Sequence, residues 1–460
     1  IAASFPDARR VAPIRGSVWC LSPFARPLLC QRTHIYIIYK DTMEGPTTYS
    51  PNLPATLRAT INLPSSKSIS NRALLLCALS GPDSSVERMS NCDDTYVMWR
   101  ALTQRPATVD IMAAGTAMRF MTAYFAICRG EEHTITGTER MRQRPIKVLV
   151  DALQQLGADI SYVDNEGYPP LHVKGRNLQG GRISLPASVS SQYISALLLV
   201  APTMTQGLTL ELVGDIISRP YINMTVSMMR TFGANIEWTD AHTLHVAPHA
   251  YLSDVIYPVE SDWSAASYWY EMMALTPDAG ATITLPWLYK ESLQGDSAVS
   301  RYFEPLGVHT AYDTEHELVV LTKCADALLP EGQTYELDLI GQPDLAQTLV
   351  VTCAMLRRPF RFSGLRSLRI KETDRMAALQ AELAKFGIAL GIEADDVLYI
   401  DSYADGTPHY NGRPIATYHD HRMAMAFAPA AMVCEGVQIA NPEVVSKSYP
   451  RYWEDLGGLG

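Results

Sequence analysis

No stretch of the 460-residue sequence is apolar over the roughly 18 residues that a membrane-spanning helix needs. The sequence also lacks an excess of positive charge: 38 Lys and Arg residues stand against 48 Asp and Glu residues, for a formal net charge of −10. A protein with this balance has no global field that attracts nucleic acid or an anionic membrane. We therefore expect neither as a partner, and an anionic substrate would need a local cluster of cations.

Paired cysteine motifs are absent as well. The eight cysteines include no C-x-x-C pair, and most lie inside apolar stretches such as LLLCALS and VVTCAML. This pattern favours buried free thiols in a reducing compartment over disulfides, so we expect a cytoplasmic protein. With 47% hydrophobic residues, the chain can bury a core large enough for two or three domains.

Several catalytic signatures are missing too. The sequence contains no G-x-S-x-G nucleophile motif and no G-x-G-x-x-G motif behind a predicted strand. His419 and His421 form a His-x-His pair, but no Cys, Asp or Glu cluster with ligand spacing completes a metal site. The sequence therefore predicts chemistry without a covalent nucleophile, a metal or an organic cofactor.

Residues 1–42 differ in composition from the rest of the chain. They carry five arginines against two acidic residues and show no amphipathic period. A cleaved transit peptide has this Arg-rich, acid-poor composition, but an upstream translated stretch ahead of Met43 explains it equally well. We assign this segment no fold and no function.

From residue 60 onward, a helix of small and apolar residues recurs six times, each time with a Gly-containing turn and a short β-rich stretch. The six helices begin near Ser70, Thr116, Gln192, Ala265, Leu345 and His421. Their apolar residues surround each helix, which is typical of helices buried on most sides. The pattern predicts an α/β fold of two similar domains, each of three repeated units with buried helices and outer sheets.

Four of the units carry a second, amphipathic helix that ends at a glycine. The glycines are Gly157, Gly233, Gly307 and Gly387. Because a residue that ends a helix often takes the left-handed conformation, which side chains resist, we expect a positive φ at each of them.

Unusual polar residues gather at the starts of the buried helices, where backbone N–H groups and the helix dipole favour anions. In LPSSKSISNRALLL, the cations Lys67 and Arg72 lie little more than one helical turn apart and can face one anion together with Ser68. A Ser-capped helix with solvated charges explains this segment alone equally well. In AAGTAMRF, Gly115 and Thr116 open a helix, and the glycine lets a phosphate or carboxylate approach the backbone.

Two further segments offer donors. In TGTERMRQRPI, Arg140 and Arg144 would point the same way from an extended stretch, although solvated surface is an equal alternative. In SVSSQYIS, neutral donors at a helix start suit a phosphate or several hydroxyls, and SRPYINM could extend that site. The residues concerned are Ser190, Ser191, Gln192, Ser218 and Tyr221.

The segment LRIKETDRM is the densest in charge. It contains Arg369, Lys371, Glu372, Asp374 and Arg375. Ion pairing along a helix could absorb these charges, but Glu372 becomes a candidate general acid or base if a second carboxylate faces it. Asp344, at the start of a buried helix in GQPDLAQT, offers that carboxylate. With Arg422 and Lys447 near the C-terminus, the set predicts a site that binds two anionic substrates and moves protons between them.

In this order, the motifs SKSISNRALLL, AGTAMR, SSQYISALL, KETDR and DHRMAMAF resemble those of the 5-enolpyruvylshikimate-3-phosphate synthases, a family of enolpyruvyl transferases. The likeness runs from about Leu63 to Leu456. It implies an inside-out α/β barrel fold in two domains, 43–65 plus 260–460 and 66–259, that close over the substrates. It also implies a cofactor-independent monomer.

The resemblance further implies the reaction. The enolpyruvyl (carboxyvinyl) group of phosphoenolpyruvate passes to the 5-hydroxyl of shikimate 3-phosphate through a tetrahedral intermediate, phosphate leaves, and the product enters chorismate and aromatic amino-acid biosynthesis. By the same resemblance, Glu372 protonates the methylene carbon, Asp344 or Lys67 takes the hydroxyl proton, and His421 assists the departure of phosphate.

Substrate-binding residues also follow from the resemblance. Shikimate 3-phosphate would be held by Lys67, Ser68, Arg72, Ser190, Ser191, Gln192, Ser218, Tyr221 and Asp344. Phosphoenolpyruvate would be held by Lys67, Gly115, Arg140, Arg375, Arg422 and Lys447, with Lys371 bridging toward the shikimate side and Thr116 as a further contact.

The sequence departs from the family pattern in three places. Met112 and Ala113 stand where Gly and Asn are usual, Phe120 stands where proline is usual, and Ser367 replaces an Asn that often precedes KETDR. The first two departures lie beside Gly115, so inhibitor response cannot be transferred from typical members.

Three alternatives remain. A UDP-N-acetylglucosamine enolpyruvyl transferase would have a Lys-Asn pair in place of Lys67-Ser68 and a reactive Cys in the loop of Arg140. A binding protein that kept the fold would have lost Lys67, Asp344 or Glu372. A phosphotransferase using Lys67 would need the P-loop glycines, which are missing.

Overall fold

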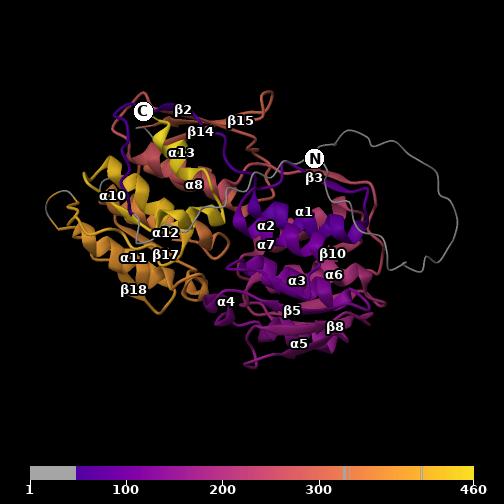
Figure 1. The fold of residues 1–460 in the computed structure, drawn as a ribbon. Helices are drawn as coiled ribbons and strands as arrows, with labels where there is room; N and C mark the ends of the chain where they lie inside the picture. The colour runs from indigo at the N-terminus through magenta and orange to yellow at the C-terminus, as the bar shows by residue number, and fades with distance from the viewer. Residues whose placement is uncertain (1–47, 325–327, 331, 405, 407, 460) are drawn as a thin grey trace.

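The computed structural model describes residues 48–324, 328–330, 332–404, 406 and 408–459. The leader prediction for residues 1–42 lies outside this range. Helices and strands alternate along the described chain, and Figure 1 shows them gathered into two lobes. The predicted α/β fold is confirmed. None of the helices described here is both long and apolar enough to cross a membrane.

The six predicted buried helices are all present. They are α1 (Lys67–Ser80), α3 (Gly115–Ile127), α6 (Ser191–Val200), α8 (Trp263–Leu275), α10 (Ala346–Met355) and α12 (His421–Phe427). Every residue of α10 and α12 is buried, and the others are buried over most of their length. Some of their hydroxyl side chains bond within the helix: Thr122, for example, donates to the carbonyl of Met118 at 2.7 Å.

Four four-stranded sheets share one strand order, with the first two strands parallel and the remaining neighbours antiparallel. The strands of the first sheet, in spatial order, are β4 (Thr108–Asp110), β5 (Glu132–Thr136), β7 (Leu171–Lys174) and β6 (Asp159–Tyr162), and those of the second are β8 (Gly181–Pro186), β9 (Leu208–Val213), β11 (Thr243–Val246) and β10 (Ile236–Trp238). The third sheet consists of β2 (Arg58–Thr60), β13 (Thr282–Pro286), β15 (Leu318–Lys323) and β14 (Val308–Asp313). The fourth consists of β16 (Tyr335–Asp338), β17 (Phe360–Ser363), β19 (Val397–Ile400) and β18 (Gly391–Glu393).

The parallel pair of strands is joined by a buried helix in three of these sheets, through α3, α6 and α10. The fourth case differs: β2 pairs with β13 although residues 61–281 lie between them. Two smaller sheets pair β3 (Ser85–Glu87) with β12 (Ile256–Pro258) and β1 (Thr48–Tyr49) with β20 (Ile439–Ala440). The long loop closed by β2 and β13 therefore contains a whole lobe of the molecule.

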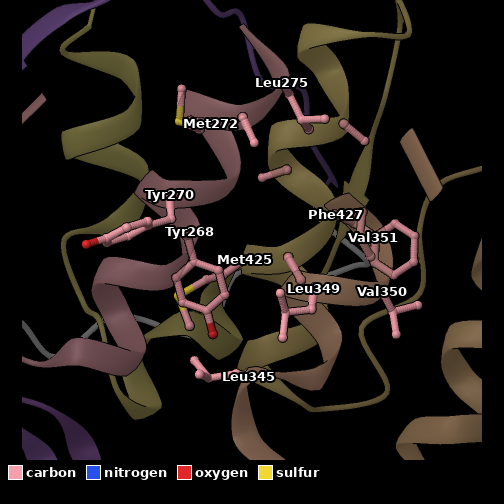
Figure 2. Packing of buried hydrophobic residues seen from close by; sticks show 14 of the residues in the cluster. Tyr268, Tyr270, Met272, Leu275, Leu345, Leu349, Val350, Val351, Met425 and Phe427 are labelled. Carbon is pink, nitrogen blue, oxygen red and sulfur yellow. The ribbon is translucent and has the colours of Figure 1, made fainter. Parts of the chain in front are cut away.

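The buried apolar side chains form two separate clusters. One cluster runs from Ile69 to Val259, and the other combines Leu57, Ile61 and Leu63 with residues from Trp263 onward. Figure 2 shows the second cluster, where Tyr268 of α8, Leu349 of α10 and Met425 of α12 approach one another. Each buried aliphatic side chain of this kind contributes about 1.5–3 kcal/mol. The two chain segments that connect the clusters run side by side, because Ser65 and Ser261 form a bridge.

The amphipathic second helices end as predicted. They are α5 (Lys147–Gln155), α7 (Arg219–Thr231), α9 (Val299–Phe303) and α11 (Arg375–Leu383), the last two continued by a 3-10 turn. Gly157, Gly233, Gly307 and Gly387 have φ values of 104°, 83°, 85° and 73°, so the predicted positive φ is confirmed. The remaining α-helices are α2 (Asp93–Gln104), α4 (Glu139–Arg142) and α13 (Tyr452–Gly457).

Candidate active site

A cavity of about 840 Å³ lies between the two clusters and is lined by residues of both lobes. The first residue or the cap of five of the six buried helices lines it: Lys67, Gly115, Ser191, Asp262 and His421. The sixth helix, α10, reaches it through Asp344 in the 3-10 helix η4 (Pro343–Leu345) that immediately precedes it. Six helix N-termini therefore direct N–H groups toward one space, which favours anionic ligands.

Most of the predicted site residues line this cavity. They are Lys67, Ser68, Arg72, Gly115, Thr116, Ser190, Ser191, Gln192, Ser218, Tyr221, Asp344, Lys371, Glu372, Arg375, His421 and Arg422. Lys447 lies at the edge of this set, where its Nζ contacts a Glu372 carboxylate oxygen at 3.2 Å. Arg140 approaches from an exposed position and donates to the backbone carbonyl of Glu372 at 3.1 Å.

Lys67 is the first residue of α1, and Ser66 caps that helix. Its Nζ lies 3.3 Å from Oδ2 of Asp94, a buried carboxylate on α2. Burial lowers the pKa of Lys67, but Asp94, Cys92 and Glu372 together raise it by more, so the pKa lies above its usual range. Lys67 is therefore an ammonium ion in the free protein.

Arg72 faces the same cavity, but its guanidinium is already engaged inside the lobe. It donates to the Thr225 hydroxyl at 2.7 Å, to the Ser68 carbonyl at 2.8 Å and to the Ser195 hydroxyl at 3.2 Å. Burial lowers the pKa of Arg72 to about 10. These bonds orient Arg72 by tying α1 to α6 and α7.

Neutral donors line the same wall. Ser190 caps α6 by accepting from Gln192 N at 3.3 Å, and Gln192 Nε2 donates to the Thr116 hydroxyl at 3.2 Å. Ser218 has a φ of 56° and donates its backbone N–H to the Ile340 carbonyl of the other lobe at 2.9 Å. The predicted grouping of these hydroxyl and amide side chains is thus present around one wall.

Arg375 lies at the centre of the opposite wall and is fully buried. Its guanidinium donates to Asp420 at 2.7 Å, to Asp344 at 3.0 Å and to Glu372 at 3.0 Å. One cation therefore holds three carboxylates, and it keeps Asp344 and Glu372 on the same side of the cavity. Asp420 also caps α12 by accepting from Arg422 N at 2.9 Å.

Asp344 is surrounded by cations. Its Oδ1 lies 3.0 Å from Arg375 and 3.5 Å from the Lys371 Nζ, and its Oδ2 accepts from Arg422 at 2.9 Å. Burial raises the pKa of Asp344, but Arg422, Lys371 and Arg375 outweigh it, so the pKa lies well below its usual range. The group is a carboxylate in the free protein.

Glu372 is in the same state. Its carboxylate lies 3.0 Å from Arg375, 3.2 Å from Lys447 and 3.9 Å from Arg144. Burial raises the pKa of Glu372, but Lys447, Arg375 and Arg144 together hold it well below its usual range. A general acid needs a proton. Glu372 can therefore serve as one only after these cations pair with other anions and its pKa rises.

The predicted extended stretch around Arg140 is wrong. Residues Glu139–Arg142 form α4, because Thr138 caps the helix and its hydroxyl accepts from Met141 N at 3.4 Å. The helix turns Arg140 outward and leaves Arg144 facing the cavity. A Cβ at Gly115 would lie 2.7 Å from Arg144 Nη1, so a side chain at this position would displace the Arg144 guanidinium.

His421 lines the cavity from the start of α12. Burial lowers the pKa of His421 well below its usual range, and Lys67 and Arg422 add to the effect, so the ring is neutral. Within the described residues, neither ring nitrogen has a hydrogen-bond partner. The same part of the chain holds no group of three His, Cys, Asp or Glu side chains placed for a metal.

Four acidic or hydroxyl residues of the site were missed by sequence reasoning. Asp94 holds Lys67, Asp262 caps α8 by accepting from Ser264 N at 2.8 Å, and Asp296 lies behind Ser264. Only Asp262 carries a local signal, because an Asp immediately before a buried helix is typical of an N-cap. Asp94 and Asp296 reach the site through tertiary packing.

Comparisons with known proteins show which family the chain resembles. The family model described as EPSP synthase (3-phosphoshikimate 1-carboxyvinyltransferase) matches residues 51–109 and 102–456. A Bacteroides fragilis protein named 3-phosphoshikimate 1-carboxyvinyltransferase is 51% identical over 413 residues, which cover 90% of this chain and 98% of that protein. A Shewanella halifaxensis protein of the same name is 34% identical over 427 residues, covering 87% and 96%.

Solved structures show the same fold. The structure of EPSP synthase from Acinetobacter baumannii superimposes with a TM-score of 0.69 at 20% identity, and the match covers 90% of this chain and 98% of that one.

Proposed function

The chain belongs to the EPSP synthase family, and from that premise we propose how its side chains divide between the two substrates. It is a transferase that moves the enolpyruvyl group of phosphoenolpyruvate to shikimate 3-phosphate in aromatic amino-acid biosynthesis. The roles of individual residues, the details of proton transfer and the division into domains are the proposal.

Shikimate 3-phosphate binds along the wall of hydroxyl donors. Ser190, Ser191 and Gln192 at the start of α6 suit its phosphate, because a helix N-terminus and neutral donors meet there. Ser218 and Tyr221 border the ring, together with Lys67, Ser68 and Arg72 of α1. Asp344 faces the reacting hydroxyl from the other lobe.

Phosphoenolpyruvate binds beside the carboxylate wall. Its phosphate and carboxylate form ion pairs with the cations Lys447, Arg422, Arg375 and Arg140. Gly115 and Thr116 donate backbone N–H groups to it. Lys67 and Lys371 lie between the two substrates. Arg144 joins this set, because it contacts both Gly115 and Glu372. Two mutually repelling anions are thereby held together, which lowers the entropic and electrostatic cost of reaction.

Asp344 takes the proton of the 5-hydroxyl. Lys67 was the alternative base, but its ammonium form has no free electron pair with which to accept a proton. Asp344 is ionised and can accept one. The hydroxyl oxygen then bonds to C2 of phosphoenolpyruvate, while Glu372 gives a proton to the methylene carbon and a tetrahedral intermediate forms.

The second half of the reaction reverses one proton transfer. Glu372 recovers a proton from the new methyl group, the bond from C2 to the phosphate oxygen breaks, and the enol ether forms. Lys447 and Arg422 stabilise the charge on the departing phosphate, and the neutral His421 ring donates a hydrogen bond to it. The proton that Asp344 accepted leaves with the phosphate, so no cofactor is required.

The single observation that carries these assignments is the pairing of Asp344 and Glu372 on Arg375 at one wall of a cavity lined by cations. The experiment is release of phosphate from phosphoenolpyruvate by the purified protein, with shikimate 3-phosphate or UDP-N-acetylglucosamine as acceptor and the E372Q variant as control. Release with the first acceptor alone supports the assignment. Release of phosphate with the second acceptor contradicts it. So does the absence of phosphate release with both acceptors when the protein is folded.

We propose the finer architecture on the same basis. Residues 43–65 plus 260–460 form one domain and residues 66–259 the other, each an inside-out α/β barrel of three units. The two apolar clusters and the pairing of β2 with β13 support this division. The described residues begin at Thr48, so residues 43–47 are assigned from the sequence alone.

The protein is proposed to act as a cytoplasmic monomer. The thiols of Cys92, Cys128, Cys324, Cys353 and Cys434 are free, as in a reducing compartment. Both substrates are bound by residues of one chain, so the site needs no second copy. Light scattering of the purified protein tests the monomer directly, and a dimer mass would contradict it.

A further inference from the structure

Asp296 is a buried carboxyl group set directly behind the cavity wall. It lies in a 3-10 helix, η2 (Gly295–Ala298), and its exposed fraction is 2%. It accepts hydrogen bonds from the Ser264 hydroxyl and, at 3.4 Å to each carboxylate oxygen, from the Tyr221 hydroxyl. Ser264 and Tyr221 both line the cavity. Asp296 thus contacts the site through two hydroxyl groups.

These hydroxyls come from different lobes. Tyr221 lies on α7 and packs against the cluster that runs from Ile69 to Val259, whereas Ser264 and Asp296 belong to the other lobe. A Cβ at the neighbouring Gly295 would lie 2.4 Å from Cβ of Pro220, so the absence of a side chain lets the lobes come this close. The bond from Tyr221 to Asp296 therefore forms only when the lobes are together.

The direction of each hydrogen bond follows from the charges. A carboxylate has no proton to donate, so Ser264 and Tyr221 must both donate to Asp296. The Ser264 oxygen is then left to accept, and Arg422 donates to it at 3.4 Å. The Tyr221 oxygen is likewise left with a lone pair for a hydroxyl donor in the cavity. Asp296 in this way turns both hydroxyls into acceptors.

Keeping this charge buried is costly. Burial first, and then the nearby Asp344, raise the pKa of Asp296 to about 6, although Arg422 and the Ser264 hydroxyl oppose the shift. Asp262 on the cap of α8 and Tyr302 on α9 also face it. An unfavourable buried carboxylate beside a binding cavity is more typical of a function than of stability.

We propose that Asp296 is a positioning residue for the acceptor substrate: it orients the Tyr221 and Ser264 hydroxyls as acceptors for a hydroxyl group of shikimate 3-phosphate. The inference rests on the proposed placing of that substrate beside Tyr221. Asp296 contacts neither substrate directly, and it orients the two hydroxyls only when the lobes are together.

The test is Asp296→Asn. The amide loses one acceptor oxygen and adds a donor, so the two hydroxyls lose their common orientation. The KM for shikimate 3-phosphate should rise about tenfold or more, the typical effect of losing a hydrogen bond to a charged group. The KM for phosphoenolpyruvate should stay within about twofold of the wild type. Equal rises in both KM values would overturn the inference.

Stability should move in the opposite direction to activity. The pKa of Asp296 is raised on folding, so its favourable contribution is complete below the unfolded pKa and is lost as the pH rises through about 6. At pH 7.5, Asp296→Asn should therefore raise the Tm, and the difference from wild type should vanish near pH 4. A lowered Tm at pH 7.5 would indicate a structural role and contradict the inference.

Asp455→Asn is the matched control. Asp455 accepts from the Tyr449 hydroxyl at 2.8 Å, and burial raises its pKa too, but both residues belong to one lobe. This variant should keep both KM values. The phosphate of the substrate itself titrates near pH 6, so pH profiles are compared as ratios to this control.

A double-mutant cycle with Tyr221→Phe separates the inference from its premise. If Tyr221→Phe raises the KM for shikimate 3-phosphate and Asp296→Asn adds little in that background, the inference stands. Fully additive effects would overturn it and leave the substrate placement intact. If Tyr221→Phe leaves the KM for shikimate 3-phosphate unchanged, the proposed binding of that substrate beside Tyr221 is itself contradicted. If Asp296→Asn does not fold, Ser264→Ala must raise the same KM, and a normal value contradicts the inference.

Discussion

The Nζ of Lys447 donates a 2.8 Å hydrogen bond to the backbone carbonyl of Ala113, across the boundary between the two lobes. The same Nζ lies 3.2 Å from Glu372. Because the acceptor is a backbone atom, any side chain at position 113 preserves the contact. The departure from the usual Asn at Ala113 therefore leaves this link between the lobes unaffected.

Glu372→Gln should lower turnover by about 10²-fold or more and leave substrate binding nearly intact. The amide keeps the size of the side chain and its contact with Arg375 but cannot transfer a proton. Steady-state kinetics and calorimetric binding of phosphoenolpyruvate check this. Glu382→Gln, a buried carboxyl that contacts Lys385 and Tyr418, serves as the control. Near-normal turnover of the first variant would exclude Glu372 from proton transfer.

Binding of phosphoenolpyruvate should raise the pKa of Glu372 and draw a proton from solution. The cations that depress this pKa in the free protein, Lys447 foremost, become partners of the substrate anions. Calorimetry in two buffers of different ionisation enthalpy measures the uptake, which should increase as the pH falls from 8 toward 6. E372Q binds the same anion without this carboxyl, so subtracting its signal isolates the effect. Identical proton uptake by the two proteins would contradict the mechanism.

Lys67→Met should impair both binding and turnover, and it should also destabilise the fold. It removes the cation paired with the buried Asp94 at 3.3 Å and leaves that charge unpaired. Adding Asp94→Asn should restore the Tm without restoring activity. Unchanged kinetics in Lys67→Met would remove this residue from the site.

Arg144→Lys should raise the KM for phosphoenolpyruvate about tenfold, because the forked guanidinium beside Gly115 and Glu372 is replaced by a single point charge. Arg142→Lys is the matched control two residues away, where the side chain donates to the Gly137 carbonyl at 3.1 Å. Equal effects of the two substitutions on the KM would show that Arg144 has no specific role in binding phosphoenolpyruvate.

Gly295→Ala should reduce kcat/KM for both substrates by holding the lobes apart. Its backbone conformation accepts a side chain, so the expected effect comes from the 2.4 Å clash with Pro220 alone. Gly341→Ala adds a methyl group 3.7 Å from the same proline, an ordinary contact, and should behave like the wild type. Small-angle scattering with both substrates present would register incomplete closure. Full activity of Gly295→Ala would show that the lobes need not approach this closely.

Local features of the fold were predictable from the sequence, and long-range ones were not. The buried helices and the left-handed glycines follow from patterns within a few residues, and both predictions are confirmed. The position of Arg144 was missed because Thr138 caps an unexpected helical turn. Asp344 and Arg422 were both singled out, yet their pairing joins residues 78 positions apart. Only the tertiary packing of the chain determines which carboxylate meets which cation.

The bridge between Ser65 and Ser261 has an evolutionary consequence. Both covalent links between the lobes run along one edge, and elsewhere the lobes meet through side-chain and backbone contacts such as that of Tyr221 with Asp296. Substitutions at those contacts can change how long the product stays enclosed without disturbing either core. Selection for faster or slower turnover can therefore act on the residues at the contacts between the lobes, while the core of each lobe keeps the sequence that folds it.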